Sequence, residues 1–226
     1  MAGDEDDKKS IQGPPDLCGR QEDPETLWVM ARDCRRLDKD WIVSAGVRGE
    51  LLIPTLRIQG IECPDICLGT AYNYWDAAWR RVESYGGHLG ANGLGVNSAH
   101  QRSHKQLHIH MTEIVDLARK DLDTFQGKIG NPDTWAKSAY KVTGRNSSGL
   151  AEPHVYRICH VGNLSSYNFF GLLNDKVVKV LGEKMADQTL MVIPVSDKSA
   201  DGYYVVNSST TLSGGIGSCE GLLRCH

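Results

Sequence analysis

The feature that most constrains the fold is a short segment, residues 106–111, in which polar and apolar side chains alternate as QLHIHM. Successive side chains on a strand point to opposite sides, so this alternation is typical of a strand with one buried face. We therefore predict a strand over residues 105–111 whose apolar side chains face a core. Gln106, His108 and His110 would share the other face, with neighbours about 7 Å apart along the strand.

The remaining pattern predicts an α+β fold in which antiparallel strands are favoured over parallel ones. Apolar residues at helical spacing predict helices over 27–34, 70–85, 112–125 and 167–181, and Thr112 would cap the third of these. Short apolar runs predict strands over 40–44, 49–54, 93–97, 154–161, 189–195 and 203–207. The elements together suit an antiparallel sheet with helices packed against it.

The chain divides into a short polar segment and one larger domain. Residues 1–24 are polar and contain Gly13, Pro14 and Pro15, which predicts a disordered tail. Residues 25–226 are long enough to bury a core of their own. Two faint echoes, of ELLIPT (50–55) in LMVIPV (190–195) and of LGVNSA (94–99) in YVVNSS (204–209), permit a degenerate internal duplication.

Charge and hydropathy exclude some classes of partner. The formal net charge is −3, so charge gives no reason to expect a nucleic-acid partner. No run approaches the roughly 18 to 20 apolar residues that span a bilayer. The acidic N-terminal segment has no apolar stretch typical of a signal peptide. These observations predict a protein that is cytoplasmic or peripheral to a membrane, and they leave its oligomeric state open.

The cysteines give no clear framework. There are seven, and no two are spaced as Cys-x-x-Cys. Free thiols, one or two disulfides involving Cys34 or Cys225, and a zinc site all remain open interpretations.

The polar ladder of Gln106, His108 and His110 has three interpretations. It could be an ordinary exposed strand face. It could be a metal site, because His-x-His on a strand supplies two ligands and His100 or His104 could add a third. It could also carry a histidine nucleophile, since a neutral imidazole can attack phosphorus and form a phosphoramidate.

The nucleophile interpretation needs donors around a negatively charged phosphate. The segment just before the predicted strand supplies Asn97, Arg102 and Ser103, and Gln106 lies at the start of the strand. Ser103 followed by Gln106-x-His108-x-His110 resembles the histidine-triad superfamily motif, in which a Ser or Thr precedes His-x-His-x-His. The middle position, the nucleophile of that superfamily, falls on His108, and Gln106 stands at the first position.

Longer stretches narrow the resemblance. LLIPTLRIQGIE (51–62), NYWDAAWRR (73–81), NSAHQRSHKQLHIHM (97–111) and GSCEGLLRC (217–225) resemble segments of the CDP-diacylglycerol pyrophosphatase family. The resemblance implies a HIT-like domain over residues 25–226, with its catalytic motifs in 50–112. The internal echoes would then reflect a degenerate duplication of the HIT-like unit.

The resemblance also implies an activity, which is hydrolysis of the diphosphate bond of CDP-diacylglycerol to CMP and phosphatidate through a covalent His108–nucleotide intermediate. No metal or other cofactor is needed for the covalent steps. The resemblance implies that Ser103 and Gln106 donate to the phosphate or leaving-group oxygens. His110 and Asn97 would orient and stabilise the reacting groups, and Arg102 would neutralise charge near the second phosphate. Arg57 follows the predicted strand over residues 49–54, at a position where the wider superfamily often has His. It is either a substrate-binding residue or a solvated edge residue.

Alternative functions remain. The chain could be a hydrolase or nucleotidyltransferase acting on another nucleotide diphosphate compound, a His-x-His metal-binding protein, or a binding module without activity. A lipid substrate would also imply transient contact with a membrane surface. Aromatic residues of the predicted helix 70–85 are candidates to line an apolar groove for the lipid, with core packing as the alternative, and they are Tyr72, Tyr74, Trp75 and Trp79.

Overall fold

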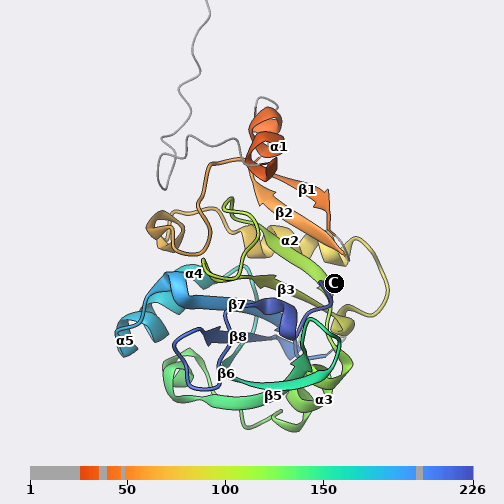
Figure 1. The fold of residues 1–226 in the computed structure, drawn as a ribbon, viewed down its shortest axis with the longest axis vertical. Coiled ribbons are helices and arrows are strands. Elements are labelled where there is room, and N and C mark those ends of the chain that lie inside the picture. Colours follow the sequence, from red (N-terminus) through yellow and green to blue (C-terminus); the bar gives the residue numbers. More distant parts are fainter. Residues whose placement is uncertain (1–25, 36–39, 47–48, 197–200, 226) are drawn as a thin grey trace, which may run out of the picture.

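A continuous eight-stranded sheet organises the part of the chain that the computed structural model describes, which comprises residues 26–35, 40–46, 49–196 and 201–225. The predicted tail over residues 1–24 lies outside these residues. All strand pairs are antiparallel, and the strand order is β1-β2-β4-β3-β7-β8-β6-β5 (Figure 1). The α+β class and the antiparallel sheet are therefore confirmed.

The strands are β1 Trp41–Ala45, β2 Glu50–Pro54, β3 Asn92–Val96, β4 Ile109–Glu113, β5 Ala139–Arg145, β6 Ala151–Val161, β7 Gln188–Pro194 and β8 Tyr203–Ser209. The helices are α1 Thr26–Arg35, α2 Tyr74–Glu83, α3 Asp116–Thr124 and α4 Phe169–Leu173, which continues through a π-helical turn, Asn174–Val178, into α5 Lys179–Leu181. Short 3-10 helices span Pro64–Cys67, Leu89–Ala91, Pro132–Lys137, Met185–Asp187 and Cys219–Gly221.

The strand order is symmetric about the central β3–β7 pair. From one edge the strands run β1, β2, β4, β3, and from the other edge they run β5, β6, β8, β7. Each half also has a helix at the same place in the chain, α2 between β2 and β3 and α4 between β6 and β7. The echoes found in the sequence were paired wrongly, because ELLIPT and LMVIPV fall on β2 and β7, and LGVNSA and YVVNSS fall on β3 and β8. Neither pair occupies equivalent places in this order.

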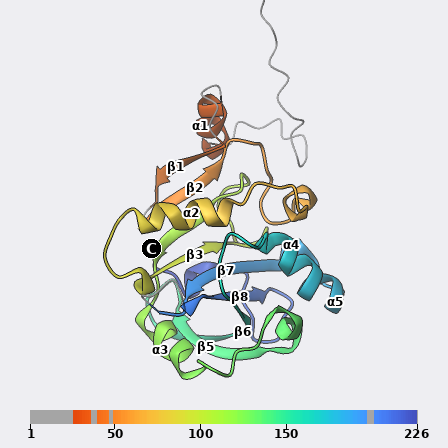
Figure 2. The same ribbon diagram turned by 180° about the vertical axis from the view of Figure 1, so that it is seen from behind.

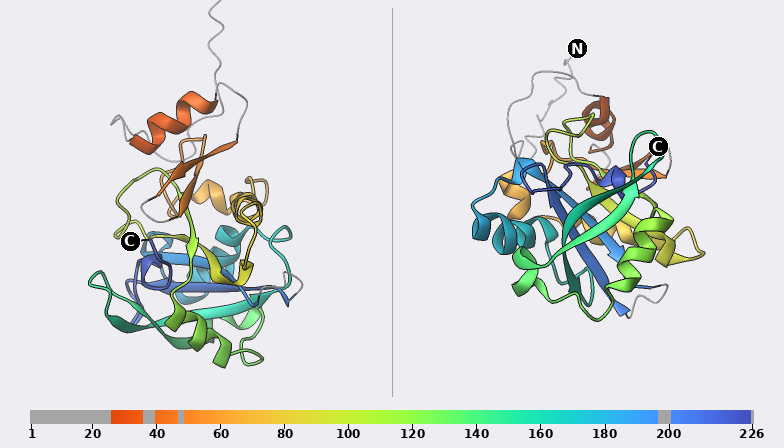
Figure 3. Two further views of the ribbon diagram at one scale, coloured as in Figure 1. Left: turned by 90° about the vertical axis from the view of Figure 1, so that its right-hand side faces the viewer. Right: turned by 60° about the horizontal axis from the view of Figure 1, so that its bottom comes forward.

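The two faces of the sheet bury different cores. Helices α2 and α4 cover one face, where Leu94, Ile109 and Val205 belong to the same buried cluster (Figure 2). Helix α3 and the C-terminal residues cover the other face over β5 to β8, and α1 packs against Ile53 on that face at the β1–β2 edge (Figure 3). Because Leu107, Ile109 and Met111 belong to the α2 and α4 side, the alternating histidines emerge on the opposite side, as predicted.

The segment around β4 differs from prediction at both ends. Regular pairing begins at Ile109, and Gln106 makes an isolated bridge with Gln59 instead of lying inside a longer strand. The strand also runs on to Glu113, and α3 begins at Asp116, so Thr112 is not its cap. Thr112 donates its hydroxyl to Arg224 O, because the C-terminal residues pair with the end of this strand and extend it.

The other elements agree with prediction except for one missed strand and one shortened helix. Strand β5 was missed because this edge strand carries Lys, Arg and Gly and has few apolar residues, as edge strands often do. Helix α2 begins at Tyr74, because Asn73 caps it by accepting from Asp76 N. Tyr74, Trp75 and Trp79 are buried core residues, as the core-packing alternative predicted, and among the four groove candidates Tyr72 alone is exposed.

The fold also bears on the expectations about thiols and membrane spans. Cys63 is disulfide-bonded, whereas Cys67, Cys159, Cys219 and Cys225 are free. A disulfide involving Cys225 is therefore wrong, and the Cys34 side chain lies outside the described part. Within the described residues, no helix has both the length and the apolar character that crossing a membrane requires.

Candidate active site

The imidazole of His108 is fixed by the backbone next to it. Its Nδ1 lies 2.8 Å from the carbonyl oxygen of Gln106, and the side chain is 5% exposed. A carbonyl oxygen only accepts hydrogen bonds, so in the neutral ring Nδ1 carries the hydrogen and Nε2 carries the lone pair. Local geometry therefore sets the tautomer that a nucleophile attacking through Nε2 requires.

His110 stands beside His108, as the alternation predicted. The two ring centroids are 5.1 Å apart with the planes steeply inclined, and the centroid of the His104 ring lies 6.1 Å from that of His108. In the sheet, His110 is directly opposite Leu51 on β2 and Gly95 on β3. Residues directly opposite each other share a face, so a glycine lies next to the His110 side chain.

The Gln106 side chain ties this segment to the chain that follows β2. Its Nε2 donates to Pro54 O at 3.0 Å and to Leu56 O at 2.7 Å, and its Oε1 accepts from Ile58 N at 3.2 Å. Both hydrogens of the amide are therefore bonded to backbone carbonyls, and the side chain is 3% exposed. The amide therefore ties the segment before His108 to residues 54–58, and neither of its hydrogens is left to donate to a phosphate or leaving-group oxygen, which is the role that the resemblance implied.

Replacing Gln106 by Glu is expected to destabilise the protein by about 2 to 4 kcal/mol, because a carboxylate cannot donate to Pro54 O and Leu56 O and would be buried against them. Urea unfolding followed by circular dichroism measures the change. Gln126→Glu, at an exposed position on the surface, is the matched control and should be near neutral. Equal stability of the two variants would contradict this role of Gln106.

Arg102 is held between a carboxylate and a backbone segment. Its two Nη atoms each donate to Glu62 at 2.5 Å, and the Arg102 side chain is 8% exposed against 23% for Glu62. Gly60 has a positive φ of 61°, and a Cβ added there would overlap Arg102 Nη1. Glycine at this position therefore lets the guanidinium lie directly on the backbone.

Asn97 connects the end of β3 to the last residues of the described chain. Its Nδ2 donates to Glu220 Oε1 at 3.1 Å, and its Oδ1 accepts from Cys219 N at 2.8 Å and from Ser218 Oγ at 3.3 Å. The side chain is 4% exposed. Its amide is thus oriented from both ends by residues more than a hundred positions away in the sequence.

These last residues, 217–225, form what we call the C-terminal strap, which lies across β3 and the end of β4. Backbone hydrogen bonds attach it, from Ser98 N to Gly217 O, from Val115 N to Leu222 O and from Arg224 N to Glu113 O. Burial and a hydrogen bond to Cys225 raise the pKa of the Cys219 thiol well above its usual range. The strap therefore contributes apolar packing, with Cys219, Leu222 and Leu223 in the buried cluster on this face of the sheet.

A small, nearly filled depression, which we call the pocket and which has no room for a water molecule as it stands, brings part of the predicted set together, and its lining is Gly60, Val96, Asn97, Arg102, Gln106, Leu107 and His108. The other three predicted residues are not part of this lining, and of these His110 stands beside His108. Ser103 is exposed in the loop between Arg102 and His104. Arg57 lies over the Trp28 ring of α1, with its guanidinium carbon 5.7 Å from the centroid.

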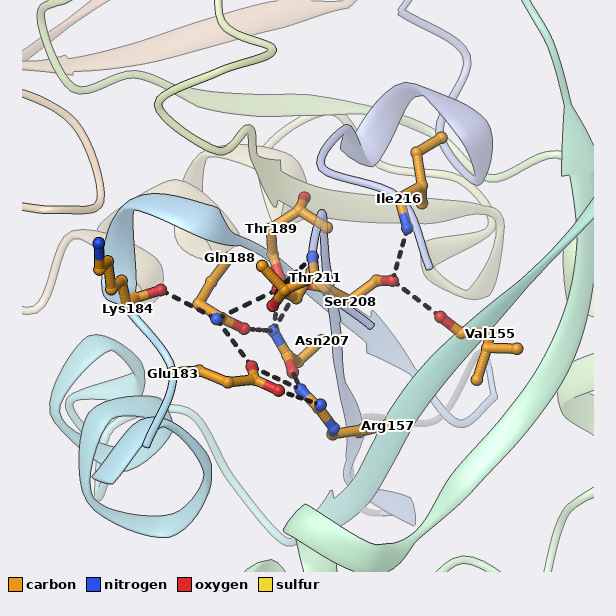
Figure 4. A network of polar contacts seen from close by, with 11 residues as sticks. Val155, Arg157, Glu183, Lys184, Gln188, Thr189, Asn207, Ser208, Thr211 and Ile216 are labelled. Carbon is orange, nitrogen blue, oxygen red and sulfur yellow. Dashed lines mark hydrogen bonds and ion pairs between the residues drawn. The ribbon is translucent and has the colours of Figure 1, made fainter. Parts of the chain in front are cut away.

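A buried polar network holds β6, β7 and β8 together behind this region (Figure 4). Arg157, which is 4% exposed, donates to both oxygens of Glu183 and to Asn207 Oδ1. Asn207 Nδ2 donates to Gln188 Oε1 at 3.0 Å, and Gln188 Nε2 donates to Glu183 Oε2 at 3.0 Å. Each member has its partners within the network, which is how buried polar groups stabilise one arrangement.

Ala186 and Asp187, which lie between Glu183 and Gln188 of this network, attach to the loop before Arg102. Ala99 N donates to Ala186 O at 2.9 Å, and His100 Nε2 lies 2.9 Å from Asp187 Oδ1. His100 is therefore paired with Asp187 and does not join the His108 cluster. Across the described residues, no group of three or more His, Cys, Asp and Glu side chains is gathered as a metal site would require.

Sequence reasoning missed Glu62 and Glu220 as site residues. Each carboxylate bonds a side chain that lines the pocket, Arg102 and Asn97 respectively. The available signal was that both lie within stretches used for the family resemblance, residues 51–62 and 217–225. Nothing local to either residue indicates its partner, because both contacts join distant parts of the chain.

Comparisons with known proteins agree on one family. The family model described as CDP-diacylglycerol pyrophosphatase matches residues 38–226. A curated protein of Yersinia pestis with the name CDP-diacylglycerol pyrophosphatase is 40% identical to this chain over 68 residues. That alignment covers 27% of this chain and 26% of the relative, so the chain spans well under two thirds of the length of the curated relative it matches.

Proposed function

Because the chain belongs to the CDP-diacylglycerol pyrophosphatase family, we propose that it hydrolyses the diphosphate bond of CDP-diacylglycerol to CMP and phosphatidate. The observation that carries the mechanism is the hydrogen bond between His108 Nδ1 and Gln106 O, since it leaves the lone pair on Nε2.

The proposed reaction has two displacements. In the first, His108 Nε2 attacks the cytidine-side phosphorus, the bond from that phosphorus to the bridging oxygen breaks, and phosphatidate leaves. In the second, water attacks the same phosphorus and loses a proton to solvent, the nitrogen–phosphorus bond breaks with its electron pair returning to Nε2, and CMP is released. Splitting one difficult displacement into two in this way is the advantage of a covalent intermediate.

The neighbouring groups have supporting roles in this proposal. The Arg102 guanidinium retains N–H groups beyond those given to Glu62 and stabilises negative charge on the phosphates. His110 and the oriented amide of Asn97 stabilise the reacting phosphate, and exposed Ser103 donates to a leaving-group oxygen. Gln106 positions the segment, and Arg57 contacts the substrate from the α1 side. No cofactor is required in this scheme.

The sheet and the substrate add two further parts to the proposal. The symmetric strand order supports an origin by duplication of one HIT-like unit, of which the first copy, with motifs in 50–112, carries the site. The substrate is a membrane lipid, so the protein makes transient contact with a membrane surface and acts in the cytoplasm or at the membrane periphery. Nucleic acid has no part in this function.

Incubating the purified chain with CDP-diacylglycerol in detergent micelles and ¹⁸O-labelled water tests the proposal. We expect equimolar CMP and phosphatidate, with the label in CMP, and we expect activity to persist after chelation and dialysis because an imidazole nitrogen performs the attack. The label would appear in phosphatidate if the lipid-side phosphorus were attacked. Loss of activity on chelation, restored by zinc or iron, would favour a metal site.

A soluble CDP-alcohol assayed in parallel separates the lipid enzyme from its alternative. Cleavage of the soluble compound with no cleavage of the lipid would assign the chain to another nucleotide diphosphate substrate.

A further inference from the structure

We infer that Glu62 sets the charge preference of the pocket, so that a nucleotide diphosphate diester binds in preference to a nucleotide ending in a free phosphate. The inference rests on the proposed function and specifies its substrate class. Its physical basis is the position of a carboxylate directly on Arg102, the cationic side chain that lines the pocket in the described residues.

The carboxylates bonded to the lining of the pocket outnumber its guanidinium. Arg102 faces the Glu62 carboxylate through both Nη atoms, and the Glu220 carboxylate accepts from Asn97, which also lines the pocket. Phosphate sites that accept highly charged ligands usually present an excess of cations. Here one guanidinium is accompanied by two carboxylates. The carboxylates therefore repel any negative charge of a ligand that exceeds the single positive charge of Arg102.

Diphosphate diesters and nucleotides with a free terminal phosphate differ in the negative charge that they carry. A phosphate that is esterified on both sides carries about one negative charge, whereas a terminal phosphate carries about two near neutral pH, because its second pKa is about 6. CDP-diacylglycerol and CDP-alcohols belong to the first class, and CDP and CTP belong to the second. A fixed carboxylate beside the diphosphate therefore selects against the second class by repulsion, which is a common source of specificity.

Glu62 can be neutralised without releasing Arg102. The guanidinium also lies on the backbone at Gly60, where even a methyl group would overlap it. In Glu62→Gln, the amide oxygen still accepts from one Nη atom and the side-chain shape is unchanged. This variant therefore removes the charge and keeps the position of Arg102, whereas Glu62→Asp keeps the charge and shortens the side chain.

The experiment measures dissociation constants for CDP and for the diester CDP-glycerol by calorimetry, at constant ionic strength. All variants carry His108→Ala, so that neither ligand is consumed. We expect Glu62→Gln to lower the ratio of the CDP constant to the CDP-glycerol constant by about tenfold, as expected for removal of one nearby charge. Glu62→Asp should leave the ratio unchanged even if both constants rise.

The matched control is Asp133→Asn, which removes a carboxylate that is 75% exposed and paired with Lys176 away from the pocket. The ratio of the two dissociation constants in this variant should equal the ratio in the His108→Ala protein. An unchanged ratio in Glu62→Gln, or equal ratios in Glu62→Gln and Glu62→Asp, would overturn the inference and leave Glu62 a purely structural partner of Arg102. Failure of the wild-type chain to cleave CDP-diacylglycerol would contradict the proposed function, and the binding ratio would still decide the role of Glu62.

Discussion

Replacing His108 by Ala is expected to lower turnover of CDP-diacylglycerol by on the order of 10³-fold or more, because the change removes the covalent route altogether. The fold should survive, since the hydrogen bond from His108 to the Gln106 carbonyl joins two residues of the same short segment. His110→Ala should cost less, because that ring assists the reaction without forming the bond. Initial rates in detergent micelles measure both variants, and circular dichroism confirms folding.

The intermediate itself gives a second readout for this prediction. Rapid mixing followed by an alkaline quench, which preserves phosphoramidates, should show intact protein heavier by one CMP group in the wild type and in His110→Ala. The adduct should be absent in His108→Ala. Mild and equal losses of turnover in both variants, or an adduct that persists without His108, would sink the assignment of the nucleophile.

Replacing Gly95 by Val is expected to destabilise the protein by about 3 kcal/mol and to reduce activity with it, because the added side chain has no space. A Cβ at Gly95 would lie 2.6 Å from Leu223 Cδ1 and 2.7 Å from Cys219 Cβ, both in the C-terminal strap. The strap would have to move, and with it the groups that orient Asn97. Urea unfolding gives the change in the free energy of unfolding.

A matched glycine and a double variant make this test specific. A Cβ added at Gly162 would meet no atom of another segment within 4 Å, so Gly162→Val should change stability little. Adding Leu223→Ala to Gly95→Val should restore part of the loss, because the shortened side chain makes room and the two effects are then not additive. Purely additive losses would show that the strap does not press on Gly95.

The local part of the site could be predicted from the sequence. Alternation in residues 106–111 placed His108 and His110 on one face and their apolar neighbours in the core, because side-chain direction in an extended chain depends on local geometry alone. The start of β4 was misjudged for a reason that is not local. Gln106 is bonded to the backbone at residues 54–58 instead of continuing regular pairing.

The rest of the site depends on contacts between distant segments. Asn97 and Glu220 are 123 positions apart, and Arg102 and Glu62 are 40 apart. A single sequence identifies such residues as polar but does not say which ones meet. The edge strand β5 was also missed from the sequence. Without it the second half lacked one strand, and its correspondence with the first half could not be recognised.

The central β3–β7 pair has a consequence for how the site can persist and change. In an assembly of two separate chains, such a pairing would be an isologous interface whose occupancy falls on dilution. Here both strands belong to one chain, so the platform under His108 and His110 does not depend on protein concentration. Because the two halves are parts of one chain, each position in one half can vary independently of its counterpart in the other. Strand β8, which corresponds to β4, carries buried Tyr204 and Val206 on the equivalent face. One half can therefore keep its imidazoles while the other is free to become apolar.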